Sequence, residues 1–144
     1  MIELERRFHD EIVRQAVGEY PNEACGLIAA KEGIPVRVYP MRNADASPVT
    51  YRFDTKEQLK VTDEIEEAGE ELYAIYHSHT HSEAFPSATD IRKAHFQGEG
   101  DDELVAWFPD VRYLILSLQD RDRPVLRGFQ FQHGEPVEEE VRIG

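Results

Sequence analysis

The most constraining feature of the chain is an apolar segment that runs directly into polar residues able to bind a metal. Leu72–Tyr76 has the composition of a buried strand, and His77 and His79 follow it at once. Because side chains alternate along a strand, the two imidazoles project to the same side while Ser78 points back. The fold must therefore bury this strand and still present both histidines together at its end.

A second polar element, Ser87–Asp90, begins after seven residues that follow His79. Asp90 lies in the first turn of a predicted helix, so its carboxylate returns toward the strand end, where sites in α/β sheets usually lie. On their own, Ser87 and Asp90 favour a helix capping box. The complete pattern, His-x-His-x7-Ser-x2-Asp, should arise by chance in roughly one in several thousand chains of this length. The joint pattern therefore favours a metal site.

Two histidines and one aspartate are a ligand set typical of catalytic zinc. His77, His79 and Asp90 would leave the fourth position of a tetrahedral ion for water. A structural zinc normally uses four protein ligands, often cysteines, and Cys25 is the only cysteine. Hydrolysis also needs a base and an oxyanion donor, for which Ser87 is a candidate. Spacing alone leaves four glutamates as candidates for the base: Glu23, Glu32, Glu57 and Glu83.

Size and composition indicate one folded domain over residues 1–144. A chain of 144 residues with 40% hydrophobic content can bury roughly two-thirds of its unfolded surface. Because it has no apolar run of roughly 18 residues and no secretory signal at Met1–Arg7, we expect a cytoplasmic protein without a membrane partner. The formal charge of −13 argues against a nucleic-acid partner. A generally solvated acidic surface is favoured over steering toward a basic partner.

Periodicity and turn residues predict a mixed α/β fold. Helices are expected over Phe8–Glu19, Thr55–Gly69 and Ser87–Phe96. Strands are expected over eight segments: Ile2–Leu4, Cys25–Ala30, Val36–Pro40, Tyr51–Phe53, Leu72–Tyr76, Arg112–Leu118, Val125–Gln132 and Val137–Ile143. Helices interspersed with hairpin-linked strands indicate a single-domain, three-layer α/β/α arrangement with a mixed sheet flanked by helices.

Several conspicuous residues are expected to be structural. For His81, an exposed loop position is favoured over a ligand role, because Asp90 fills the third ligand position. Cys25 is expected to be a buried strand residue and not a reactive thiol. For Trp107–Pro109, packing against the core is favoured over contact with a partner. The remaining histidines are expected on the surface: His9, His95 and His133.

These motifs resemble the signature of the JAMM (MPN-domain) metalloproteases. The segment His77–Asp90 matches the family's ligand motif, and Tyr20–Ile28 resembles its other element, in which a glutamate precedes a strand of small and apolar residues. The resemblance implies that Glu23 is the general acid/base holding the zinc-bound water, and that Ser87 stabilises the tetrahedral intermediate. It implies one Zn²⁺ with three protein ligands, His77, His79 and Asp90. It also implies a mixed sheet flanked by helices, similar to the cytidine deaminases.

The resemblance covers nearly the whole chain and is closest to small bacterial members of the CysO–cysteine peptidase type. Four segments carry this closer likeness: Asn43–Pro48, Tyr51–Asp54, Glu57–Lys60 and Tyr76–Thr80. It implies cleavage of a peptide or isopeptide bond after the C-terminal Gly-Gly of a ubiquitin-like sulfur carrier protein, for example with release of cysteine. The link between Phe96 and Phe108, with the insertion Gln97–Glu103, is longer than usual and could alter an entrance or partner surface.

Two further functions compete with hydrolysis. The first is a non-catalytic MPN-type scaffold or interaction module, against which the complete set of five site residues argues. The second is a nucleobase deaminase, whose His-x-Glu and Pro-Cys-x-x-Cys elements are absent from the sequence. Nothing in the sequence indicates an oligomeric state.

Overall fold

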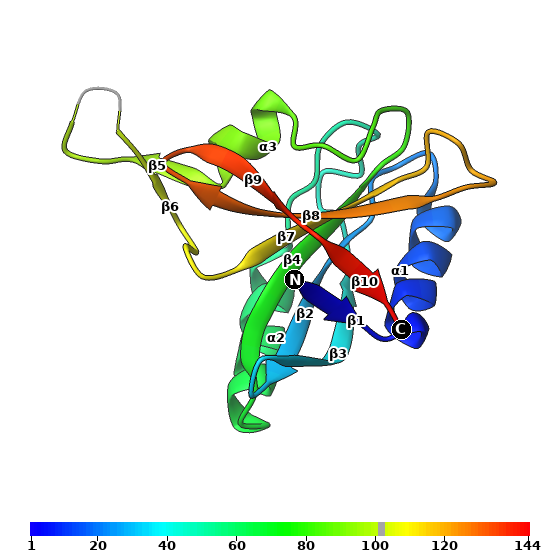
Figure 1. Cartoon of the computed structure of the whole chain (residues 1–144), viewed down its shortest axis with the longest axis horizontal. Helices are drawn as coiled ribbons and strands as arrows, with labels where there is room; N and C mark the ends of the chain where they lie inside the picture. The colour runs from blue at the N-terminus through cyan, green and yellow to red at the C-terminus, as the bar shows by residue number, and fades with distance from the viewer. Residues whose placement is uncertain (101–102) are drawn as a thin grey trace.

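The computed structural model describes residues 1–100 and 103–144 and is built around a six-stranded sheet (Figure 1). From edge to edge, its strands are β3 (Ile34–Met41), β2 (Cys25–Lys31), β4 (Glu71–His79), β7 (Arg112–Ser117), β8 (Val125–Gln132) and β9 (Glu135–Glu139). The β4–β7 pair is parallel and the other neighbouring pairs are antiparallel. The expected mixed sheet is confirmed.

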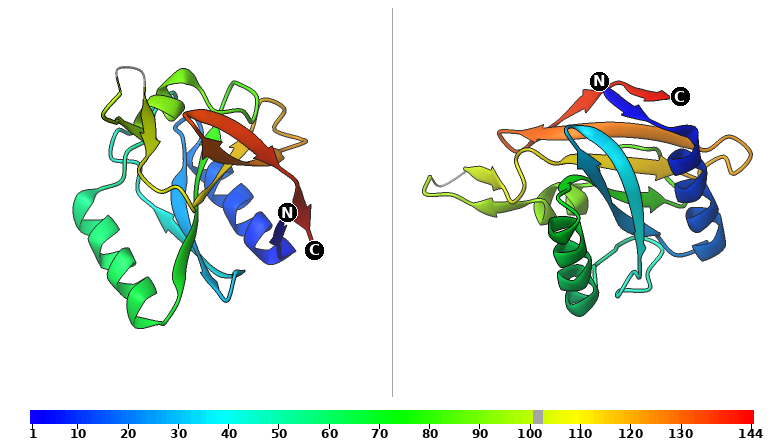
Figure 2. Two further views of the ribbon diagram at one scale, coloured as in Figure 1. Left: turned by 60° about the vertical axis from the view of Figure 1, so that its left-hand side comes forward. Right: turned by 90° about the horizontal axis from the view of Figure 1, so that it is seen from below.

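Helices cover both faces of this sheet (Figure 2). Helix α1 (Arg6–Glu19) buries Phe8, Ile12 and Ala16 in the core on one face. Helix α2 (Thr55–Glu67) buries Val61 and Ile65 on the opposite face. These apolar positions recur at helical spacing, which is why each helix packs along one stripe. The expected α/β/α layering is confirmed, and among the described residues no helix is long and apolar enough to cross a membrane.

A short two-stranded sheet lies over the α1 side of the main sheet. Strands β1 (Ile2–Leu4) and β10 (Val141–Ile143) pair in parallel and so join segments from opposite ends of the sequence (Figure 1). They approach β8 closely at Gly128, where a Cβ atom would lie only 2.5 Å from Ile2 Cδ1. The expected strand over Val137–Ile143 is therefore divided, because β9 pairs with β8 while β10 leaves the main sheet to pair with β1.

The helix expected over Ser87–Phe96 is shorter than predicted. Helix α3 spans only Ala88–Lys93. The chain then continues into β5 (His95–Gln97), which pairs with β6 (Leu104–Ala106) to form a projecting hairpin (Figure 1). The prediction that His95 lies on the surface is wrong: its Nδ1 donates to the Ile91 carbonyl, and its ring packs edge-on against Phe131. Residues 101 and 102 of the insertion Gln97–Glu103 lie outside the described residues.

Two other local expectations are also wrong. Tyr51–Phe53 forms a single bridge, between Asn43 and Phe53, and not a strand. The amide of Asn43 donates to the carbonyls of Glu23 and Thr50, which holds this segment as a loop beside the sheet. The segment Trp107–Pro109 does not bury its aromatic side chains, since Trp107 is 57% exposed.

Candidate metal centre

The carboxyl end of β4 carries both candidate histidines within the sheet. His77 pairs with Cys25 of β2 on one side and with Ile115 of β7 on the other. Both imidazoles are buried, with exposed fractions of 1% for His77 and 4% for His79. Because the two residues are two apart on one strand, they project to the same face, as the sequence predicts.

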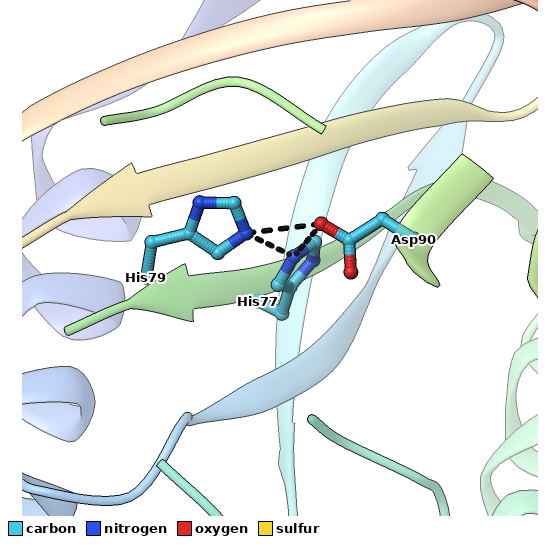
Figure 3. A group of neighbouring side chains, drawn as sticks. All are labelled: His77, His79 and Asp90. Atoms are coloured by element: carbon cyan, nitrogen blue, oxygen red, sulfur yellow. Dashed lines mark hydrogen bonds and ion pairs between the residues drawn. The ribbon is translucent and has the colours of Figure 1, made fainter. Parts of the chain in front are cut away.

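Asp90, from the first turn of α3, meets these two rings (Figure 3). Its Oδ2 lies 3.1 Å from Nε2 of His77 and 3.0 Å from Nε2 of His79, and the two nitrogens are 3.2 Å apart. In a tetrahedral zinc site with bonds of about 2.0–2.1 Å, neighbouring donor atoms are about 3.3 Å apart. The three donor atoms are therefore spaced to share one ion of this size.

The hydrogen bonding around the rings also fits a bound cation. His79 Nδ1 donates to the Glu83 carbonyl at 2.7 Å, so the neutral ring presents a lone pair at Nε2. That lone pair faces a carboxylate oxygen and a second imidazole nitrogen. Within the described residues, the buried Nδ1 of His77 has no hydrogen-bond partner. A shared cation would hold the three atoms together with both rings neutral, whereas without it a hydrogen on a histidine Nε2 is needed for contact with the carboxylate.

The electrostatics reflect the same crowding. Burial raises the pKa of Asp90, but without a metal the protonated forms of His77 and His79 donate to its carboxylate, which outweighs burial and holds that pKa well below its usual value. Burial lowers the pKa of His77. At His79 burial acts in the same direction, but its bonds to Asp90 and the Glu83 carbonyl prevail and raise the pKa. The aspartate is therefore an anion held against the two rings.

Ser87 and Asp90 do form the capping box that the sequence predicts. The Asp90 N–H donates to Ser87 Oγ at 3.0 Å, and the Ser87 N–H donates to Asp90 Oδ2 at 2.9 Å. The oxygen that faces the histidines is thus also anchored by the helix start. Since Ser87 Oγ accepts this bond, its hydroxyl hydrogen remains available to a substrate.

Glu23 lies two residues before β2, close enough to His79 and Asp90 for their charges to act on its carboxyl group. The pairing of the two strands continues past Cys25 because Ser78 N–H donates to the Ala24 carbonyl and the Ala24 N–H donates to Ser78 Oγ. The Glu23 side chain is 4% exposed, and its Oε1 has no hydrogen-bond partner among the described residues. Burial raises its pKa to about 8, with opposing contributions from His79, which lowers it, and Asp90, which raises it. The structure thus places all five predicted site residues in one region.

Two contacts of the site could not be read from sequence spacing. The Tyr51 ring stacks on His77, with centroids 4.5 Å apart and an interplanar angle of 22°. The Glu83 carbonyl orients His79, although Glu83 was a candidate only through its carboxylate. The sequence signal for Tyr51 was an aromatic residue in a loop, which does not indicate what it touches.

The remaining candidates are not at the metal centre. His81 is exposed and its Nε2 lies 3.0 Å from the Tyr20 hydroxyl, as expected for a loop residue. Cys25 is fully buried, and burial raises its thiol pKa to about 12, so it is not a reactive thiol.

Sequence comparison identifies the class of protein that this fold and site define. The chain belongs to the family described as prokaryotic homologs of the JAB domain, which matches residues 5–127. This confirms the resemblance to JAMM/MPN-domain proteins. Among curated proteins, it is 40% identical over 134 residues to the CysO-cysteine peptidase of Mycobacterium tuberculosis, covering 92% of this chain and 84% of the relative.

Solved structures agree with this assignment. Protein DSY2949 from Desulfitobacterium hafniense superposes with a TM-score of 0.80 and 32% identity, covering all of this chain and 93% of the other. A structure described as JAMM, a metalloprotease-like zinc site in the proteasome and signalosome, has a TM-score of 0.54 and 15% identity over 99% of this chain and 98% of that one. The second likeness establishes the shared fold alone.

Proposed function

We propose that the protein is a zinc-dependent metallopeptidase. It hydrolyses the peptide or isopeptide bond after the C-terminal Gly-Gly of a ubiquitin-like sulfur carrier protein, for example to release cysteine. The observation that carries this proposal is the convergence of Asp90 Oδ2 with the two histidine Nε2 atoms, next to the buried Glu23. The 40% identity to a CysO-cysteine peptidase supports the substrate class.

The donor set His77, His79 and Asp90 would hold one Zn²⁺, which when bound polarises the scissile carbonyl and lowers the pKa of water to about 7. In this proposal Glu23 takes a proton from the attacking water and passes it to the leaving amine. Its buried position and raised pKa suit this, because a carboxyl that titrates near neutrality can both accept and donate a proton. Ser87 donates its hydroxyl hydrogen to the oxyanion that develops on the carbonyl.

A non-catalytic scaffold is the alternative function. A scaffold has no need for a carboxyl held buried and unpartnered beside a metal-binding set, since such burial costs stability. Glu23 therefore favours the enzyme. We further propose that residues 1–144 act as one catalytic domain in the cytoplasm.

The test combines metal content with an assay for release of the C-terminal amino acid from a carrier conjugate. The wild type should contain one zinc per chain and release the amino acid, whereas Glu23→Gln should retain zinc and lose activity. Glu32→Gln is the matched control, because Glu32 lies in the β2–β3 turn and should leave activity unchanged. A purified protein without metal, or a Glu23→Gln variant as fast as the wild type, would show that the mechanism is wrong.

A further inference from the structure

The backbone of Glu23 is held by the loop that follows β3. Strand β2 begins two residues after Glu23, so the pairing of the main sheet does not fix it. Its N–H donates to the Ser47 carbonyl at 2.9 Å, and its carbonyl accepts from Asn43 Nδ2 at 3.0 Å. The next residue, Ala24, makes both of its backbone bonds to Ser78 of β4 instead. The loop and β4 thus share the task of fixing the segment that carries the proposed base.

These backbone bonds matter because one oxygen of the Glu23 carboxyl group has no anchor of its own. Its Oε1 is buried and accepts no hydrogen bond from any residue that the structure describes. The location of the carboxyl group therefore depends on where the Glu23 backbone lies. In catalysis a misplacement of about 1 Å can cost roughly 100-fold in rate.

Asn43 uses its entire side-chain amide to hold this arrangement. Besides the bond to Glu23, its Nδ2 donates to the Thr50 carbonyl at 2.9 Å. Its Oδ1 accepts from the N–H of Asp45 at 3.0 Å and from the N–H of Arg52 at 3.2 Å. An asparagine amide offers two donor hydrogens and an oxygen with two lone pairs, so its capacity is filled. The three bonds within the loop orient the amide, and the fourth extends to Glu23.

The alternative is an asparagine that only stabilises its own loop, as asparagines commonly do. Asp45 is a residue of that kind: its carboxylate accepts from Thr50 Oγ1 and from Arg52 Nε, each at 3.1 Å and both within the loop. Asn43 differs because it is buried and because one of its bonds joins residues 20 positions apart. That bond ends on the residue proposed as the base.

We propose, on the basis of the proposed function, that Asn43 is a positioning residue for hydrolysis. Its amide holds the Glu23 backbone so that the carboxyl group stays in one place near His79 and Asp90. Asn43 takes no proton itself and acts through Glu23.

Kinetics of zinc-loaded variants test this role with a purified ubiquitin-like carrier that ends in Gly-Gly-Cys. Asn43→Asp keeps the accepting oxygen and loses both donated bonds, whereas Asn43→Ala loses all four bonds without adding charge. Both variants should retain zinc and lower kcat by about 10- to 100-fold. Asp45→Ala is the matched control, because it removes bonds within the same loop and should leave kcat within about twofold. Equal losses in Asn43→Ala and Asp45→Ala, or a loss in Asn43→Asp alone, would overturn the proposal.

A double variant separates positioning of the base from general damage to the fold. Residues that act as a unit have non-additive effects, so adding Asn43→Ala to Glu23→Gln should leave the residual rate within about twofold. A further loss of about tenfold would place the action of Asn43 elsewhere and refute its role as a positioning residue for Glu23.

Amide hydrogen exchange tests the same restraint without an assay of activity. In the wild type, the Glu23 N–H should exchange as slowly as the Ala24 N–H, and Asn43→Ala should speed exchange at Glu23 alone by about tenfold or more. Fast exchange at Glu23 in the wild type, or an equal change at both amides, would refute the restraint. A wild type that does not hydrolyse the conjugate would refute the proposed function, while the exchange rates would still show whether Asn43 holds Glu23.

Discussion

His79 donates its Nδ1 hydrogen to the backbone carbonyl of Glu83, four residues further along the chain. This bond sets the tautomer of the neutral ring, so that its Nε2 lone pair faces the point where His77 Nε2 and Asp90 Oδ2 converge. A backbone carbonyl, which no side-chain substitution removes, thus orients one side of the proposed zinc site.

Removal of the His79 ring should strongly weaken metal binding. Without this ring, two protein donors remain, so we expect His79→Ala to weaken zinc binding by more than the roughly 100-fold seen when an outer-shell partner is lost. His81→Ala is the matched control, because His81 is an exposed histidine two residues away. Competition with a zinc chelator measures both affinities. Loss of zinc in the His81 variant would contradict the assigned ligand set.

Ser87 should have two separable roles, one in the helix start and one in catalysis. Ser87→Ala removes the cap to Asp90 N–H and should cost about 1 kcal/mol of stability, whereas Ser87→Gly should cost only a few tenths. Both variants lack the hydroxyl and should lose roughly 10²–10³ in kcat. Thermal unfolding and steady-state kinetics measure the two effects. A Ser87→Gly enzyme with unchanged kcat would leave the serine with its structural role alone.

The raised pKa of Glu23 predicts how the stability of the metal-free protein depends on pH. The folded state holds this proton up to about pH 8, while the unfolded state loses it near pH 4.5. The contribution of Glu23 to stability is therefore complete below pH 4.5 and declines as pH rises toward 8, by at most roughly 1.4 kcal/mol per pH unit. Relative to Glu23→Gln, the wild type in a chelating buffer should become less stable over this range.

Denaturant unfolding of the two proteins at several pH values measures this difference. Bound zinc should reduce this pH-dependent difference in stability, because a nearby cation favours the charged carboxylate of Glu23. A wild type that gains stability over Glu23→Gln as pH rises from 4.5 to 8 without metal would contradict the burial of Glu23 as a neutral acid.

Gly26 should not tolerate a side chain, because β2 passes close to its neighbours at this position. A Cβ atom would lie 2.3 Å from the Tyr76 hydroxyl oxygen and 2.5 Å from the Tyr39 backbone carbonyl. Gly26→Ala should therefore destabilise the fold by about 1–3 kcal/mol. Gly18→Ala in α1 is the control: nothing lies within 4 Å, and the alanine should stabilise the helix by up to about 1 kcal/mol. Unfolding free energies would contradict this if both substitutions had the same sign.

Much of the architecture could be predicted because it depends on local patterns. The stripe Phe8, Ile12 and Ala16 indicates a helix wherever it packs, and the apolar run before His77 indicates a buried strand. The ligand motif could be predicted for the same reason. Alternation along the strand places His77 and His79 on one face, and the first turn of the following helix carries Asp90. Predictions were wrong where the outcome depended on distant partners, as for His95, which is buried because Phe131 lies beneath it.

The amino-acid order alone thus specified three candidate metal donors, a helix cap and the alternation of elements, since each depends on residues within about fourteen positions of one another. Tertiary structure alone brought Glu23 near His79, because only the pairing of β2 with β4 joins Ala24 to Ser78, which are 54 residues apart. It also decided that Tyr51, Lys93 and Trp107 surround one cavity next to the metal centre. No sequence period relates these three residues. Their proximity follows from how two loops and a short helix pack over the end of the sheet.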